Sequence, residues 1–411
     1  MSKVTQNKQG MKILIAGSAL QFFLGILYVW SVFVKPVGEA YQWRDESVRL
    51  MTSYMLSFFV VGILIGGKLQ LKIGAGKVVL LGGLTLAAGM LATAFLPAGL
   101  AWFMYFTYGI AGGFGVGSAY NAIISAAQKW FPQNRGFATG VTVCAFGFST
   151  VVFAPLIETL IGLFGVRYAF MILAAAFCIV VLALFRFIKL PDEKPMGNPG
   201  AQGVRTAAPP AGAEPAKRQY TLSETIKTKE FYLLTLSLML ATAAFFILNP
   251  SFKALAIERG LGDSAGTLVV MLTGVANALG RLGTPLLSDK IGREKSAVVI
   301  ILATAACALL LSFAGGIVFM ATIAVIAFCY GGFSGIYPVL TADYFGLKNV
   351  GSNYGAVMMG FALSALTFPM LIGLINNIII KFIVLGALAA VGAFLIFLLT
   401  GSRRYRCQKN S

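Results

Sequence analysis

Apolar segments long enough to cross a lipid bilayer recur along this chain and leave little sequence for anything else. About 20 helical residues span a hydrocarbon core of about 30 Å. The chain is 58% hydrophobic and 11% charged, whereas soluble domains are about 25% charged. We therefore predict an all-α polytopic membrane protein. Its twelve predicted transmembrane helices lie near residues 12–35, 48–70, 77–97, 101–127, 137–163, 167–189, 230–255, 265–288, 295–314, 317–340, 352–375 and 379–400.

A single long polar stretch, residues 190–229, separates these segments into two sets of six. Its many Pro, Gly and Ala residues are typical of a flexible linker, because they cannot bury a core. We expect six-helix bundles at residues 1–189 and 230–411, the second ending in a tail. A short interfacial helix is predicted over residues 221–231, with Thr221 or Ser223 as its N-cap.

The excess of basic residues follows the membrane topology. The chain has 32 Lys and Arg against 14 Asp and Glu, a net charge of +18. Basic patches interleaved with aromatic residues are absent, so nucleic acid is not an expected partner. The termini, the linker and the loops on their side hold 24 basic residues, and the opposite loops hold 6. The positive-inside rule therefore predicts cytoplasmic termini. The N-terminal run 11–25 resembles a signal peptide, but it continues to Val34 and is read as an uncleaved helix.

Residue types that support catalysis or metal binding are missing from the sequence. It has no His and no CxxC pair, and four of its five Cys lie inside apolar segments. A metal or haem site is therefore not expected, and we predict no cofactor. Nucleophile–base pairs and phosphate-binding loops are also absent, so the chain is not expected to be an enzyme.

Arg281 is a cation that no choice of helix ends moves out of its apolar segment. Such a residue costs about 2.5–3.5 kcal/mol on insertion scales and usually faces a protein-lined cavity with an anion in it. No Asp or Glu falls at comparable depth in the other segments. We therefore predict that Arg281 binds an anionic substrate. The alternative is an arginine that contacts helix-end carbonyls or extends to the bilayer surface.

Further polar side chains are expected around this arginine. Asn277 precedes it by four residues, so both lie on one face of the helix. The planar guanidinium suits a carboxylate, because it can contact both oxygens. Candidate contacts at matching depth in other segments are Tyr28, Tyr120, Asn121 and Tyr330.

The loop after the second predicted helix has a similar sequence in the two halves of the chain. The two loops read GKLQLKIGAGK at 67–77 and PLLSDKIGREK at 285–295. The pair resembles the G-x-L-x-D-[RK]-x-G-[RK] signature of the major facilitator superfamily. The second copy keeps Asp289 and Arg293, whereas Leu71 replaces the Asp in the first. We predict that Asp289 and Arg293 act in gating, since an Asp at a helix end can latch neighbouring helices.

Longer motifs resemble the oxalate/formate antiporter family of that superfamily. They are LYVWSVF (27–33), GVGSAYNAI (115–123), KWFPQNRGFATG (129–140), NALGR (277–281), LLSDKIGR (286–293), CYGGFSGIYP (329–338) and NYG (353–355). The Asn–x–x–x–Arg spacing is also similar to the Asp–x–x–x–Arg pair of animal monocarboxylate transporters. The resemblance implies the major facilitator fold, with its two six-helix repeats, in a monomer of the bacterial cytoplasmic (inner) membrane.

One departure from the family bears on the substrate. The resemblance places a second cation, a lysine, where this chain has Phe361, and a glutamine where it has Leu27. A second carboxylate would be left unpaired in such a site, which is unfavourable. We therefore expect a monocarboxylate of the lactate or pyruvate type, with Phe361 on the apolar side of the site.

Three functions are open at this stage. We favour alternating-access symport of a monocarboxylate with a proton, which travels on the substrate or a nearby water. An oxalate/formate-type exchanger is the first alternative and needs no proton site. A sensor that binds the anion without transport is the second, although no soluble output domain is present.

Overall fold

The computed structural model is helical through nearly all of the described chain, residues 3–191, 218–248, 255 and 263–409. The prediction of an all-α polytopic protein is confirmed, since these ranges contain no strand. Eight described helices are long and apolar enough to cross a membrane, and the one at Arg135–Phe187 covers two predicted spans. The predicted spans near 101–127, 265–288 and 295–314 are helical in their described residues as well. The helix at the last of them begins earlier than predicted, with Arg293, Glu294 and Lys295.

The helices before residue 190 form a first group. Their bounds are α1 Lys3–Leu24, η1 Gly25–Val29, α2 Trp30–Tyr41, α3 Asp45–Ile73, α4 Ala75–Ala94, η2 Ala98–Phe103, η3 Tyr105–Ile110, α5 Ala111–Trp130, α6 Arg135–Leu184 and η4 Phe185–Phe187. The predicted span 12–35 is thus interrupted at η1. A Cβ on Gly25 would lie 2.1 Å from the Phe146 carbonyl oxygen, so glycine lets η1 approach α6 closely.

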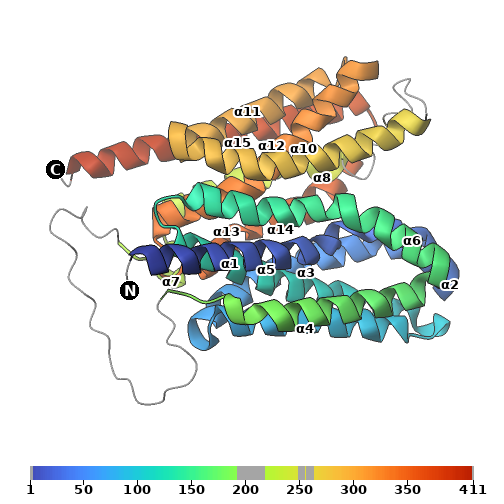
Figure 1. Cartoon of the computed structure of the whole chain (residues 1–411). Coiled ribbons are helices and arrows are strands. Elements are labelled where there is room, and N and C mark those ends of the chain that lie inside the picture. The colour runs from blue at the N-terminus through green and yellow to red at the C-terminus, as the bar shows by residue number, and fades with distance from the viewer. Residues whose placement is uncertain (1–2, 192–217, 249–254, 256–262, 410–411) are drawn as a thin grey trace, which may run out of the picture.

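The helices after residue 217 form a second group. Their bounds are α7 Leu222–Thr225, α8 Lys229–Leu248, α10 Asp263–Ile291, α11 Arg293–Leu310, α12 Gly316–Phe345, α13 Val350–Val357, α14 Met359–Gly373 and α15 Ile378–Lys409. Most of the predicted linker, residues 192–217, lies outside the described residues. Figure 1 shows the starts of α1 and α7 at one end of the molecule, which we call the linker end.

Two predicted helices, 137–163 and 167–189, are the two arms of α6. The chain folds back at Gly165 (φ 80°, ψ 164°), a backbone conformation that glycine adopts without strain. The two arms run side by side with the helices of the first group in Figure 1. The turn between the arms lies opposite the linker end.

Thr221 is the N-cap of α7, as one of the two predicted alternatives. Its hydroxyl accepts from the Glu224 backbone N–H, and the Glu224 carboxylate accepts from the Thr221 N–H at 2.8 Å. These bonds, first those from Thr221 and then that from Arg218, lower the pKa of Glu224 to about 2. The helix itself is shorter than predicted, because it ends at Thr225.

Close backbone packing joins α10 to α12. A Cβ on Gly331 would lie 2.0 Å from the Asn277 carbonyl oxygen, and one on Gly280 would lie 1.9 Å from that of Phe328. Small residues allow such approach in membrane helices. Farther along α10, Pro285 has no N–H for the carbonyl of Arg281, four residues earlier. The two groups of helices meet where α6 packs on α10 and α3 packs on α13.

Candidate functional site

Arg281 lies in the middle of α10, where that helix faces α6 of the first group. Its side chain is 1% exposed. A Cβ on Gly147 would lie 2.8 Å from the Arg281 Cδ, so glycine at this point of α6 makes room for the side chain. The arginine therefore extends from the second group of helices to the boundary with the first.

Two hydrogen bonds hold the guanidinium. Its Nε donates to the Asn277 Oδ1 at 2.7 Å, and an Nη2 hydrogen goes to the Tyr28 hydroxyl at 3.2 Å. The predicted Asn277–Arg281 pair thus forms on one face of α10. The Asn277 amide oxygen therefore orients the guanidinium. This role differs from donating a hydrogen bond directly to a ligand.

Aromatic faces surround the same cation. The guanidinium carbon lies 5.4 Å from the Tyr28 ring centre and 5.6 Å from that of Phe146. Such contacts stabilise a partly desolvated cation, but they do not neutralise it. Among the described residues, no carboxylate lies within ion-pair distance of Arg281. A guanidinium has five N–H donors, so it retains donors for an anion.

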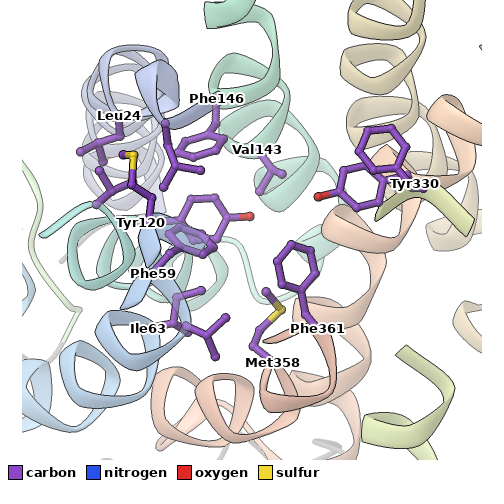
Figure 2. Close-up of a cluster of buried hydrophobic side chains, with 14 of the residues drawn as sticks. Leu24, Phe59, Ile63, Tyr120, Val143, Phe146, Tyr330, Met358 and Phe361 are labelled. Carbon is purple, nitrogen blue, oxygen red and sulfur yellow. The ribbon is translucent and has the colours of Figure 1, made fainter. Parts of the chain in front are cut away.

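The predicted tyrosines Tyr28, Tyr120 and Tyr330 come together from three separate helical elements. The hydroxyls of Tyr28 and Tyr330 are 3.4 Å apart. Figure 2 shows the Tyr120 and Tyr330 hydroxyls pointing toward one another. Tyr330 stacks on Phe245 with ring centres 3.7 Å apart, which fixes its ring. The matching depth of these three tyrosines in their predicted spans was therefore enough to predict that they lie together.

Phe361 also lies in this cluster. Its ring centre is 4.8 Å from that of Phe246 and 6.2 Å from that of Tyr330. Its side chain is 3% exposed, and in Figure 2 it lies between Tyr120 and Tyr330. The side of the site where the family resemblance implied a second cation is therefore aromatic.

Asn121 does not join the cluster, in contrast to our expectation. Its amide nitrogen donates to the backbone carbonyls of Ile63 and Gly351, both at 2.7 Å. Successive helical residues point about 100° apart, so Tyr120 faces Arg281 while Asn121 faces α3 and α13. The amide is occupied by protein carbonyls, and we leave Asn121 out of the substrate site.

The predicted gating pair lies at the linker end. Asp289 and Arg293 form an ion pair, and Asp289 also accepts from the Phe137 backbone N–H at 3.1 Å. Phe137 is in the first turn of α6, where free N–H groups and the helix dipole favour an anion. The carboxylate on α10 thus caps a helix of the first group.

Two further charges, which the sequence did not indicate as site residues, extend this network. Asp343 on α12 pairs with Arg293 at 3.3 Å and with Arg135 at the start of α6. The four side chains are 12–21% exposed, so solvent screens them only in part. The Arg135–Asp343 pair joins residues 208 apart in sequence. Opposite charges at segment ends were the only available signal, and they did not specify the pairing.

Sequence comparison agrees with this architecture. The sequence profile of the Major Facilitator Superfamily matches residues 14–369, with a second match at 234–410. The chain belongs to the major facilitator superfamily. The two matches cover most of the chain, and the resemblance from sequence motifs is confirmed.

Relatives within the superfamily include carriers of small acids. The chain is 28% identical over 348 residues to the oxalate:formate antiporter of Oxalobacter formigenes, covering 80% of this chain and 76% of that protein. It is 25% identical over 403 residues to apicoplast pyruvate carrier 1 of Toxoplasma gondii, covering 83% and 72%. A crystal structure of FucP, the fucose:proton symporter of Escherichia coli, superposes with a TM-score of 0.70 at 15% identity. It covers 94% of this chain and 98% of that one, which supports the major facilitator fold.

Proposed function

We propose that this member of the superfamily is a secondary transporter that moves small monocarboxylates of the lactate and pyruvate type together with a proton. The observation that carries this proposal is Arg281, which is 1% exposed and has no carboxylate partner in the described chain. Removing an unpaired charge from water is strongly unfavourable. A carboxylate substrate supplies the missing counter-charge and accepts the remaining N–H donors.

The aromatic surroundings support a monoanion over a dianion. Phe361 and Phe146 lie close to the site on opposite sides of Tyr120 (Figure 2). A second carboxylate would face these rings without a cation, whereas a methyl group would be accommodated. The names of the related antiporter and pyruvate carrier agree with a small organic acid.

Alternating access is the mechanism that this arrangement supports. Residues 1–189 and 230–411 act as two bundles that rock around Arg281, and the Asp289 network holds the linker end closed. An empty carrier keeps a buried charge and reorients slowly. When a carboxylate is bound, the charge of Arg281 is nearly neutralised and the carrier reorients faster. The ligand therefore controls the rocking step.

The proton and the orientation complete the proposal. The described helices place no carboxylate near Arg281, so the proton moves on the substrate or on a water beside it. The excess of basic residues on the linker side supports a cytoplasmic linker end in a bacterial inner membrane. The transporter acts as a monomer with both termini inside.

Uptake of labelled lactate into proteoliposomes tests this function. We expect uptake that accelerates when the outside is made acidic, and no uptake by Arg281→Gln. Arg186→Gln is the matched control, because Arg186 in η4 lies over the neighbouring Phe185 ring, and it should leave uptake unchanged. Binding without flux would indicate a sensor. Flux that requires an internal anion and ignores pH would indicate an exchanger.

A further inference from the structure

A buried hydroxyl near Arg281 has no hydrogen-bond partner. Tyr354 on α13 is 1% exposed, and its hydroxyl is unpaired within the described structure. Buried phenol hydroxyls usually have a hydrogen-bond partner, because a buried hydroxyl without a hydrogen bond destabilises the folded protein. An unpaired hydroxyl that also borders a substrate site is available to a ligand oxygen.

Tyr354 belongs to the face of its helix that borders the site. It precedes Met358 by four residues and Phe361 by seven, which is the spacing of one helical face. Met358 keeps helical dihedrals (φ −65°, ψ −11°), so the face continues from α13 into α14. Figure 2 shows the Phe361 ring near the hydroxyls of Tyr120 and Tyr330, with Met358 next to Phe361 on the side away from them. Tyr354 thus lies one turn from Met358 and two turns from Phe361, toward the linker end.

The Tyr354 hydroxyl is also close to the charged part of the site. It lies within electrostatic range of Tyr120, Arg281 and Tyr28, with Tyr120 as its strongest polar neighbour. The two phenol hydroxyls are close enough to interact, but their geometry does not make a full hydrogen bond in the described structure. A ligand oxygen beside the two phenols would give Tyr354 its missing partner.

Lactate and pyruvate carry such an oxygen on C2, next to the carboxylate. We propose that Tyr354 binds the C2 oxygen of the substrate and makes the carrier selective for 2-hydroxy and 2-oxo monocarboxylates over unsubstituted short-chain acids. This inference rests on the proposed function, in which Arg281 binds the carboxylate. A phenol O–H donates equally well to a hydroxyl and to a keto oxygen, so both classes are covered.

A second tyrosine provides a matched control. Tyr108 is fully buried, and its hydroxyl is also unpaired in the described structure. Its neighbours are the rings of Trp30 and Phe170, with centres 4.8 and 5.6 Å away. Tyr108→Phe therefore removes an unpaired hydroxyl whose aromatic neighbours are not among those that contact Arg281.

The experiment measures the affinities of lactate, pyruvate and propionate for the purified full-length protein by calorimetry. Propionate has the length of lactate but no oxygen on C2. Wild type should prefer lactate to propionate. Tyr354→Phe should lower lactate and pyruvate affinity by about 3- to 10-fold, the effect of one neutral hydrogen bond, and leave propionate within about twofold. Tyr108→Phe should change none of the three.

The outcomes separate the two proposals. Equal affinity of wild type for lactate and propionate, or equal losses for all three acids in Tyr354→Phe, would overturn the role of Tyr354 while leaving the carrier function intact. Wild type that binds none of the acids would overturn both. The wild-type preference does not depend on any variant folding, so it tests the inference even if Tyr354→Phe is unstable.

Discussion

The side-chain amide of Asn121 on α5 donates to the backbone carbonyl of Gly351 on α13 at 2.7 Å, joining the two groups of helices inside the bundle. The backbones meet closely here, since a Cβ on Gly67 of α3 would lie 2.3 Å from the same carbonyl oxygen. A hydrogen bond of this kind exists only while α13 remains against α3 and α5. Asn121 therefore stabilises the conformation that is closed at the linker end.

Asn121→Ala should shift the carrier toward conformations open at the linker end. The bond to Ile63 stays within the first group, so only the bond to Gly351 distinguishes the two states. Its loss is worth about 0.5–1.5 kcal/mol, or roughly a 2- to 10-fold change in population. Spin labels at Lys72→Cys and Lys348→Cys, in a variant without native cysteines, report the opening as a longer distance. An unchanged distance distribution would show that the bond does not select a state.

Asn277→Asp should convert lactate binding into a strongly pH-dependent process. The new carboxylate would replace the Oδ1 that now accepts from the Arg281 Nε at 2.7 Å, and it would compete with the substrate. We expect at least about a tenfold loss of affinity at pH 7, the scale of one charge-assisted bond. Affinity should recover as pH falls, because protonation removes the competing charge.

Asn277→Ala is the control for this variant. It removes the orienting amide without adding charge, so affinity should fall by about 1–2 kcal/mol at every pH tested. Calorimetric titrations of both variants from pH 5 to pH 8 (about the range where lactate stays ionised) make the comparison. Parallel pH curves for the two variants would contradict the competition between carboxylates.

Phe361→Lys should shift preference toward dicarboxylates. The substitution places a cation beside Tyr330 in a site that has Arg281 as its other charge. Competition by oxalate against labelled lactate should increase at least about tenfold, as expected for a second charge-assisted contact. Phe361→Leu removes the ring without charge and should leave oxalate a weak competitor. Lack of any shift in the lysine variant would mean that Phe361 does not contact the substrate.

Asp289→Ala should impair transport more than binding. It removes both the ion pair with Arg293 and the cap on the Phe137 N–H at the start of α6. Lactate affinity in detergent should stay within about twofold, since Arg281 is two turns away, while uptake falls by about fivefold or more, as loss of a paired charge predicts. Glu39→Ala is the control, because the Lys35–Glu39 pair is largely exposed and contributes little. Equal losses of binding and uptake would argue against a gating role.

The parts of this site that the sequence predicts are those set by helical periodicity and depth. Asn277 and Arg281 are four residues apart on one helix, so their contact follows from local geometry alone. Tyr28 and Tyr330 were found by their depth in the membrane, although the interruption of α1 at η1, which positions Tyr28, was not foreseen.

The parts that sequence reasoning missed depend on contacts between distant segments. Tyr120 and Asn121 are adjacent in sequence but face different neighbouring helices. The local sequence does not indicate which helix each of them faces. Arg135 and Asp343 each look like a solvated charge at a segment end until the fold brings α6 and α12 together. Tyr354 lies in the NYG motif, but its unpaired hydroxyl can be recognised only once its surroundings are known.

One face of α10 carries Arg281, Pro285 and Asp289 at successive steps of four residues. Because proline has no amide hydrogen, the turn between Arg281 and Asp289, the residues proposed to bind the substrate and to gate, lacks one backbone hydrogen bond. That turn can bend when an anion pulls on Arg281 without any further loss of backbone bonding. A tilt of the segment beyond it would draw the Asp289 carboxylate away from the first turn of α6. Binding of an anion at Arg281 would in this way weaken the contact of Asp289 at the membrane surface through the bending of a single helix.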